Sequence, residues 1–253
     1  MTAEPVEIRR IGVLGGGVMG GGIGQVAATV GYDVVIRDVD DERLEKTRST
    51  IVDTRFGLRR GVELGKIEAE DLPRIIDRLA YTTDLADLAD VDLLIEAIPE
   101  QLPLKQAAFA ELDGLVRPEA IFASNTSGFV IEEIAKEVSD DRKARFAGMH
   151  FASPVPAMKM CEVIYTPLTS EQTTATVRRV AEQMGKVVSM VRDTPGTYGF
   201  ILNRVFGAAA REARKIVEDG IASPEDVDKA MINGRNWPVG FFGSRGVRTG
   251  WLE

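Results

Sequence analysis

The chain has 253 residues, 44% of them hydrophobic and 28% charged, which is typical of a globular protein with one large domain or a large and a small one. Its 39 acidic residues outnumber 31 basic ones, and the net charge of -8 argues against general binding to nucleic acid or to anionic membranes. The first seven residues contain two glutamates, and no apolar run reaches the roughly 18 residues of a membrane span, so neither a targeting segment nor a membrane helix is expected.

Short apolar runs rich in β-branched residues alternate with longer amphipathic segments through the first three quarters of the chain. The apolar runs predict strands, and the segments between them predict helices. The predicted strands are 11–15, 33–38, 91–98, 120–125, 145–151 and 186–191, and the clearest helical patterns are 42–56 and 104–115. Because buried strands that alternate with helices form a parallel sheet covered on both faces, the pattern indicates an α/β fold with a Rossmann-type, doubly wound, mostly parallel sheet.

The pattern changes after the turn at Pro195-Gly196, which is the best candidate for a domain boundary. Apolar residues then recur at helical spacing over 200–219, and 223–231 predicts a second helix capped by its first serine. We therefore expect a sheet domain at 1–195 and a short, all-helical C-terminal domain at 196–253.

A glycine-rich motif, GGGVMG, follows the first predicted strand, with Gly15, Gly17 and Gly20 at G-x-G-x-x-G spacing. The first glycine allows a tight turn, the second lets the backbone approach a pyrophosphate, and the third lets the next helix pack on the strand. The helix N-terminus, which includes Val18 and Met19, then offers N–H groups and a positive dipole end to that phosphate. Its place between a strand and a helix makes the motif a predicted dinucleotide site.

The second predicted strand ends in Asp38, eighteen residues past Gly20. A carboxylate at this distance accepts hydrogen bonds from the ribose hydroxyls of NAD and repels the 2′-phosphate of NADP. Arg37 would partly offset that repulsion if its side chain turned toward the ribose. We therefore expect NAD as the cofactor, with a clear preference for NADH over NADPH.

The only histidine, His150, lies at the end of the apolar run GMHF, and Glu162 follows it after two prolines. A single histidine is more often a surface or core residue, but beside a hydride acceptor an imidazole can take the hydroxyl proton of an alcohol. A carboxylate on the other ring nitrogen would fix the tautomer and stabilise the imidazolium. The prolines allow a second strand to return beside the first, which would place Glu162 against His150.

One cysteine, Cys161, cannot form an intramolecular disulfide and fits a reducing compartment, so a cytoplasmic location is expected. We interpret this cysteine as a small buried hydrophobic residue rather than a nucleophile. With one cysteine and one histidine, any metal site would consist mostly of carboxylates, and no metal is expected.

In these motifs and several others the chain resembles the L-3-hydroxyacyl-CoA dehydrogenases of fatty-acid oxidation and butyrate metabolism. The similarity runs from about Ile8 to Gly240 and includes GGGVMGGGIGQVAA, IEAIPEQLPLK, FASNTSG, GMHFASPVPAMKMCEVI, GKVVSMVRDTPG, GFILNRVF and EDGIASPEDVDKAM. The resemblance implies an NAD-dependent enzyme that interconverts an L-3-hydroxyacyl-CoA and a 3-ketoacyl-CoA.

The resemblance also implies roles for single residues. His150 matches the family's catalytic base and Glu162 its orienting carboxylate. Ser127 matches a residue that binds the substrate's 3-oxygen near the nicotinamide, and Asn203 matches an asparagine that holds the same oxygen. The matched cofactor contacts are Gly15, Gly17, Val18, Met19, Gly20, Asp38, Ala97, Glu100, Lys105 and Ser127. Taken singly, Glu162 would be a solvated charge, Asn203 a polar residue at a helix end, and Ser127 the cap of a helix beginning near Val130.

Coenzyme A carries several phosphates, and the region after Asp38 is rich in basic residues. Arg55 and Arg59 are four apart, so they would share one face of a continuous helix. This region contacts the coenzyme A moiety in the family, and the resemblance places substrate binding at Thr54, Arg55, Arg59 and Arg60. A solvated, charged helix face is the alternative interpretation of each residue.

The chain departs from the family pattern at several places. HFASPVP stands where the family usually reads HFFNPVP, so Ala152 leaves more room and Ser153 replaces an asparagine that contacts the cofactor. Three residues, 197–199, are inserted after the DTPG turn, and GFFG replaces the family's G-P-F-E. The part that follows Asn203 is shorter than the family's helical domain.

A shortened helical domain buries little apolar surface by itself, so we expect a homo-oligomer, a dimer or larger. Its aromatic anchors would be Trp237, Phe241, Phe242 and Trp251, unless these residues form a local apolar cluster. The expected partners are an acyl-CoA substrate and further copies of the chain, without nucleic acid or membrane.

Two other functions stay open. One is a dehydrogenase of a free hydroxy acid or hydroxylated small molecule, such as carnitine or gulonate, which the altered HFAS block would admit. The other is a non-catalytic, dinucleotide-binding protein. The joint presence of four matched residues counts against it: His150, Glu162, Ser127 and Asn203.

Overall fold

The computed structural model describes residues 3–196 and 198–243, and the chain divides into two compact units, Met1–Tyr198 and Gly199–Glu253. The division follows Tyr198, close to the turn at Pro195-Gly196 where we expect a boundary. The described part of the first unit contains the sheet, and that of the second is helical.

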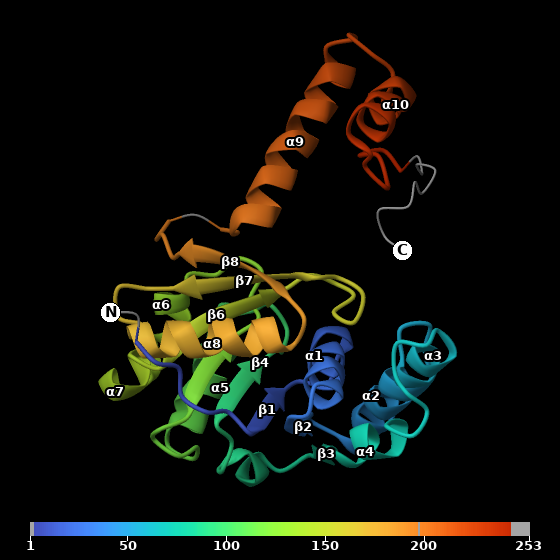
Figure 1. The fold of residues 1–253 in the computed structure, drawn as a ribbon. Coiled ribbons are helices and arrows are strands. Elements are labelled where there is room, and N and C mark those ends of the chain that lie inside the picture. Colours follow the sequence, from blue (N-terminus) through green and yellow to red (C-terminus); the bar gives the residue numbers. More distant parts are fainter. Residues whose placement is uncertain (1–2, 197, 244–253) are drawn as a thin grey trace. The chain divides into compact units, whose positions relative to one another are not determined.

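A sheet of eight strands forms the centre of the first unit, counted over its described residues (Figure 1). The strands are β1 (Arg10–Leu14), β2 (Asp33–Arg37), β3 (Leu79–Thr82), β4 (Leu93–Glu96), β5 (Ile121–Ser124), β6 (Phe146–Phe151), β7 (Met160–Tyr165) and β8 (Val187–Arg192). Their spatial order is β3-β2-β1-β4-β5-β6-β7-β8. All neighbours pair in parallel except β6 and β7, which are antiparallel. The predicted Rossmann-type, mostly parallel sheet is therefore confirmed.

Helices follow the strands along the chain and flank the sheet. They are α1 (Val18–Thr29), α2 (Asp41–Asp53), α3 (Leu58–Glu63), α4 (Leu72–Asp77), α5 (Leu102–Asp113), α6 (Ile131–Ile134), α7 (Asp140–Lys143) and α8 (Glu171–Gln183), with the short 3-10 turns η1 (Leu85–Leu88) and η2 (Ala135–Glu137). Because parallel strands are joined by crossover helices, this arrangement covers both faces of the sheet.

Alternate residues of each strand face two separate layers of the core. Ile23 of α1 and Val177 of α8 belong to one buried cluster with strand residues such as Val13. On the opposite face, the Phe109 ring of α5 lies 5.6 Å from Phe122 and 4.6 Å from Phe146, measured between centroids. The two layers thus bury apolar side chains on both faces of the sheet.

The helix expected over 42–56 ends earlier than its sequence pattern indicates. α2 stops at Asp53, and Thr54 is extended, with φ -84° and ψ 174°. The chain then turns back against α2. The backbone at Gly57 lies so close to this helix that a Cβ there would meet the Val52 carbonyl oxygen at 2.7 Å. Arg55 lies in this break and Arg59 in α3, so the prediction that they share one face of a continuous helix is wrong.

The second unit contains α9 (Ile201–Glu218) and α10 (Pro224–Arg235) within its described residues. Ser223 accepts a hydrogen bond from the Asp226 N–H, which confirms the predicted cap of the second helix. The Phe206 ring lies 6.0 Å from Trp237 and 5.6 Å from Phe241, so these two expected anchors belong to a local aromatic cluster.

Phe242, the third expected anchor, is 40% exposed, and Trp251 lies outside the described residues. Among the helices of residues 3–196 and 198–243, none combines the length and the apolar character that a membrane span requires.

Candidate active site

A cavity of about 730 Å³ opens where the strand order reverses, beyond the carboxyl ends of β1, β2 and β4. This crevice is the place where ligands bind in open α/β sheets. Its lining includes Gly15, Gly17, Val18, Met19, Asp38 and Ala97, all predicted cofactor contacts. A second cavity of about 500 Å³ shares Gly17, Val18 and Asp38 with it.

The glycine-rich loop has the geometry of a phosphate cradle. Gly15 has a φ of +95°, and a Cβ there would lie 2.9 Å from the Ala97 carbonyl oxygen. A Cβ at Gly20 would lie 1.8 Å from the Gly15 carbonyl oxygen, so the third glycine lets α1 approach the loop. Gly17 is the N-cap of α1 and has open space around it, which leaves the positive end of the helix accessible.

Asp38 follows β2 and is only 8% exposed. Its carboxylate accepts the Gly16 N–H at 2.8 Å and the Val39 N–H at 2.7 Å. Thr47 of α2 donates its hydroxyl to the Gly16 carbonyl at 2.7 Å and so binds the same loop. The carboxylate is fixed at the cavity wall, where it fits a ribose with free hydroxyls better than a 2′-phosphate.

His150 and Glu162 form a buried pair across two strands. β6 and β7 run antiparallel with these two residues directly in register. His150 Nδ1 lies 2.7 Å from Glu162 Oε2, and the two residues are 6% and 1% exposed. Glu162 is therefore not a solvated strand-end charge. Because a carboxylate can only accept a hydrogen bond, this contact favours the tautomer that carries its proton on Nδ1.

A lysine side chain binds the connection between β6 and β7. Lys186 donates its ammonium to the Val155 carbonyl at 2.6 Å and to the Met158 carbonyl at 2.9 Å. Burial lowers the pKa of Lys186. Satisfying two carbonyls of an irregular segment in this way fixes the return of the chain from β6 to β7.

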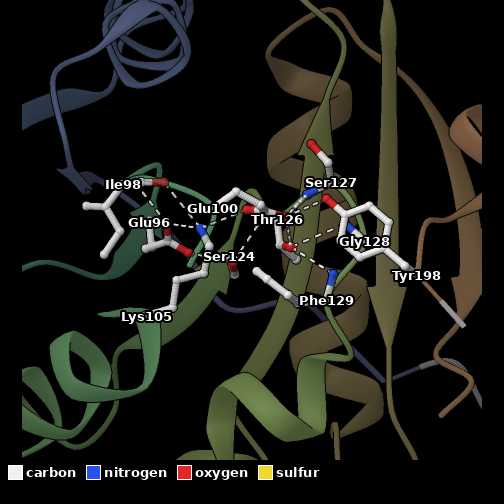
Figure 2. A network of polar contacts seen from close by, with 10 residues as sticks. All are labelled: Glu96, Ile98, Glu100, Lys105, Ser124, Thr126, Ser127, Gly128, Phe129 and Tyr198. Carbon is white, nitrogen blue, oxygen red and sulfur yellow. Dashed lines mark hydrogen bonds and ion pairs between the residues drawn. The ribbon is translucent and has the colours of Figure 1, made fainter. Parts of the chain in front are cut away.

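Ser127 lies in the loop after β5, and Glu100 lies in the connection between β4 and α5. Glu100 Oε1 accepts the Thr126 hydroxyl at 2.6 Å and the Ser127 N–H at 2.9 Å (Figure 2). Lys105 is 1% exposed, and its ammonium contacts Glu96 and Glu100. The structure thus brings three predicted cofactor contacts into one polar network.

The predicted coenzyme A residues lie outside both cavities, around the break between α2 and α3. Arg59 pairs with Asp53 at 2.5 Å and Arg60 with Glu63 at 2.7 Å. The Arg55 guanidinium lies over the Phe56 ring, 4.3 Å from its centroid. Asn203, the fourth predicted catalytic residue, lies on α9 in the second unit.

Two residues of the site were not anticipated. Glu96 is fully buried at the end of β4, and Asn125 Oδ1 accepts the Phe151 N–H at 3.0 Å beside His150. The sequence contains a signal for Glu96, because a carboxylate inside the apolar run LLIEAI would be buried and a buried charge requires partners. Asn125 follows a buried strand, which is where polar site residues of α/β sheets gather.

Cys161 is completely buried next to Glu162, and burial raises the pKa of its thiol to about 12. This agrees with its interpretation as a small hydrophobic residue. Over residues 3–196 and 198–243, the structure assembles no group of three or more His, Cys, Asp or Glu side chains suited to a metal ion.

Comparison with known proteins identifies relatives along almost the whole chain. The family model described as 3-hydroxyacyl-CoA dehydrogenase, NAD binding domain, matches residues 10–194, and that of the C-terminal domain matches residues 199–245. A probable 3-hydroxybutyryl-CoA dehydrogenase of Deinococcus radiodurans is 41% identical over 91% of this chain and 80% of its own length. The mitochondrial hydroxyacyl-coenzyme A dehydrogenase of Homo sapiens is 38% identical over 95% of this chain and 76% of its own.

Among solved structures, the (S)-3-hydroxybutyryl-CoA dehydrogenase PaaH1 from Ralstonia eutropha has the same fold, with a TM-score of 0.86 and 36% identity. The superposition covers 93% of this chain and 80% of that one.

Proposed function

Because the chain belongs to the 3-hydroxyacyl-CoA dehydrogenase family, we propose that it interconverts an L-3-hydroxyacyl-CoA and a 3-ketoacyl-CoA by hydride transfer with NAD. The observation that supports this most directly is the buried His150–Glu162 pair, with 2.7 Å between Nδ1 and Oε2. Such a pair supplies the base that oxidation of a secondary alcohol requires.

In the proposed reaction, His150 Nε2 takes the proton of the substrate's 3-hydroxyl. Glu162 keeps the Nδ1 proton in place and stabilises the imidazolium that forms. NAD, when bound, supplies the acceptor for the hydride that leaves the same carbon. In the reverse direction the imidazolium returns its proton to the carbonyl oxygen as the hydroxyl forms.

We assign the substrate's 3-oxygen to Ser127 and Asn203. Glu100 accepts the Ser127 N–H and so fixes the backbone that carries the Ser127 hydroxyl. Donors placed where negative charge develops on the oxygen lower the barrier in both directions. Asn203 of α9 matches the family's asparagine for the same oxygen, and we assign it the same role.

On the cofactor side, the glycine loop and the start of α1 would hold the pyrophosphate, through Gly15, Gly17, Val18, Met19 and Gly20. Asp38 would accept both ribose hydroxyls. Ala97 lines the cavity directly, whereas Lys105 would act through Glu100, because its ammonium is already enclosed by carboxylates.

For the coenzyme A moiety we propose the segment with Thr54, Arg55, Arg59 and Arg60. A bound phosphate would replace Asp53 as the partner of Arg59 and Glu63 as the partner of Arg60, and both of these ion pairs are exposed. Exposed ion pairs contribute only about 0–1 kcal/mol, so this exchange costs little.

A dehydrogenase of a free hydroxy acid is the second candidate. Two points favour it: Ala152 is smaller than the phenylalanine that the family usually has there, and the arginines near α3 already have carboxylate partners. A non-catalytic dinucleotide-binding protein would have no use for the buried His150–Glu162 pair.

We also propose a cytoplasmic location and a homo-oligomer. The oligomer rests on the exposed apolar residues of α9, among them Val205 at 66% and Phe206 at 52% exposure. Light scattering at micromolar concentration should give at least twice the monomer mass of 27.6 kDa, and a monomer would contradict the oligomer.

The function is tested by following NADH oxidation with acetoacetyl-CoA and, in parallel, with free acetoacetate at equal concentration. Rapid turnover of the thioester alone is the expected result. Turnover of acetoacetate at a similar rate would favour the free hydroxy acid. Tight NADH binding without turnover of either compound would overturn both dehydrogenase proposals for these substrates.

A further inference from the structure

Glu96 is a carboxylate without solvent contact at the carboxyl end of β4. It accepts the Lys105 ammonium at 2.5 Å, the Ser124 hydroxyl at 2.6 Å and the Ile98 N–H at 2.8 Å. Burial raises the pKa of Glu96, and Lys105 opposes that effect. A charge in this position costs free energy that well-packed apolar side chains would not cost. Its presence therefore requires an explanation beyond core packing.

The network continues from Glu96 toward the proposed substrate site (Figure 2). The Lys105 ammonium also contacts Glu100 Oε2 at 3.2 Å and the Ile98 carbonyl at 3.3 Å. Glu100 Oε1 then accepts the Thr126 hydroxyl and the Ser127 N–H. The path thus leads from a buried strand end to the backbone of Ser127 through the Lys105–Glu96 hydrogen bond of 2.5 Å, the Lys105–Glu100 ion pair of 3.2 Å and the Ser127–Glu100 hydrogen bond of 2.9 Å.

Two separate segments are joined by this path. Glu96, Ile98 and Glu100 belong to the strand β4 and the connection that follows it, whereas Ser124, Thr126 and Ser127 belong to β5 and its loop. Thr126 extends the contact, since its oxygen accepts the Gly128 and Phe129 N–H groups at 3.2 and 3.0 Å. Tyr198 adds an outer hydroxyl contact to Glu100 at 3.3 Å.

We propose that Glu96 is a positioning residue for the reaction, acting through Lys105 on Glu100 and through Glu100 on the Ser127 loop. The proposal rests on the proposed function for its effect on catalysis. The ammonium, held between two carboxylates, fixes Glu100 in the orientation in which both Thr126 and Ser127 donate to it. Displacing a substrate-binding hydroxyl by about 1 Å can cost about 100-fold in rate, so a network that fixes the backbone has kinetic consequences.

A matched control exists at the other end of the same sheet. Asp113 accepts the Arg142 guanidinium at 2.8 Å and the Ser139 N–H at 2.7 Å, and Arg142 is 3% exposed. Arg142 also donates to the carbonyl of Ala120, which directly precedes β5, whereas Ser124 ends that strand. Asp113→Asn thus weakens a mostly buried ion pair of similar kind without touching the Ser127 loop.

The experiment compares Glu96→Gln with Asp113→Asn in the full chain. Amide hydrogen exchange of the 125–129 segment is the first readout and requires no substrate. We expect Glu96→Gln to accelerate this exchange by about 10-fold and Asp113→Asn to leave it unchanged. The second readout is turnover of acetoacetyl-CoA, in which kcat should fall about 10- to 100-fold for Glu96→Gln and less than about 2-fold for Asp113→Asn.

The proposal is overturned if Glu96→Gln lowers the melting temperature but leaves the exchange of 125–129 at the wild-type rate. Absence of acyl-CoA turnover in the wild type would instead refute the proposed function, and the exchange readout would still decide the role of Glu96. If Glu96→Gln does not fold, Ser124→Ala removes one donor to the same carboxylate; because the Ser124 hydroxyl also accepts the Thr126 N–H directly, only the exchange of 127–129 is compared. Ser124→Ala should accelerate the exchange of 127–129 by a smaller factor, and wild-type exchange there would count against the proposal.

Discussion

His150 and Glu162 meet because β6 and β7 run antiparallel with the two residues in register. Their neighbours Met149 and Cys161 belong to the core cluster on one face, so the strand period of two turns His150 and Glu162 together to the other face. Side chains directly opposite each other in an antiparallel pair lie about 5 Å apart at Cβ, which is within reach of a hydrogen bond between imidazole and carboxylate.

Asp38 should determine the choice of cofactor. Asp38→Asn removes the charge that repels a 2′-phosphate and an acceptor for the ribose. We expect kcat/KM with NADH to fall about 10- to 100-fold, since hydrogen bonds to charged groups are worth about 1.5–3 kcal/mol. The preference for NADH over NADPH should shrink accordingly.

Steady-state kinetics with both cofactors measure this effect. Asp41→Asn is the control, because Asp41 is exposed on α2 and lines neither cavity. An Asp38→Asn protein that keeps its full preference for NADH would show that other groups select the cofactor.

The pairing of His150 with Glu162 could be predicted because both residues stand out in the sequence as rare or charged within apolar strands. Glu100 and Lys105 were identified by resemblance alone. The role of Glu96 could not be predicted from the sequence, because two of its partners, Ser124 and Lys105, come from other elements and only the folded chain brings them to it.

Helix α1 depends on two glycines for different reasons. A Cβ at Gly20 would lie 1.8 Å from the Gly15 carbonyl oxygen, so Gly20→Ala forces backbone apart and should destabilise the fold by about 1–3 kcal/mol or more. A Cβ at Gly17 meets nothing within 4 Å, and Gly17 has a negative φ of -58°. Gly17→Ala should therefore keep the melting temperature while weakening NADH binding.

Thermal unfolding and NADH titration of both variants separate the two roles. The loop has the predicted cradle function only if Gly17→Ala folds as well as the wild type and binds NADH less tightly. Wild-type affinity in Gly17→Ala would show that no phosphate approaches the backbone at this position.

Secondary structure could be predicted where the pattern of apolar residues was long. The prediction failed where the segments were short. β3 has only four residues, and buried and exposed positions do not alternate along it, so it gives no alternating signal. The break between α2 and α3 depends on the return of Gly57 against Val52, a close contact that apolar periodicity does not report. The strands and the mostly parallel sheet were predictable because their apolar runs alternate regularly with helices.

The single cysteine should report on the stability of the first unit. Cys161 is fully buried, and its pKa of about 12 keeps the thiol protonated at neutral pH. We expect no alkylation of the native protein by iodoacetamide at about pH 8, and one modified thiol per chain after unfolding in guanidinium chloride. Mass spectrometry counts the modified thiols, and Cys161→Ala gives the background.

The same shift has a defined effect on stability. The folded pKa lies above the value of about 8.5 in an unfolded chain, so the contribution of the thiol is complete below about pH 8.5 and is lost as the pH rises toward 12. Cys161→Ala should lose less stability than the wild type over this alkaline range. Rapid alkylation of the native thiol would contradict its burial.

At the scale of the whole molecule, the sequence could predict the division into two parts better than the role of the aromatic residues in the second part. The change of pattern near Pro195-Gly196 indicated a second, helical part, and the structure has such a part from Gly199 onward. The aromatic residues there were predicted to be oligomer anchors, whereas Trp237 and Phe241 pack with Phe206 in their own unit. Composition alone does not distinguish a local cluster from an interface, because both are apolar.

The central claim is that His150, held by Glu162, transfers the proton while NADH gives its hydride to a 3-ketoacyl-CoA. A single-turnover reaction of enzyme-bound NADH with acetoacetyl-CoA tests it most directly, with the wild type and His150→Asn side by side. The wild type should oxidise its bound NADH rapidly. His150→Asn should bind NADH with nearly unchanged affinity, because the glycine loop and Asp38 are intact, and react about 100- to 10,000-fold more slowly. An unchanged rate in His150→Asn would contradict the mechanism.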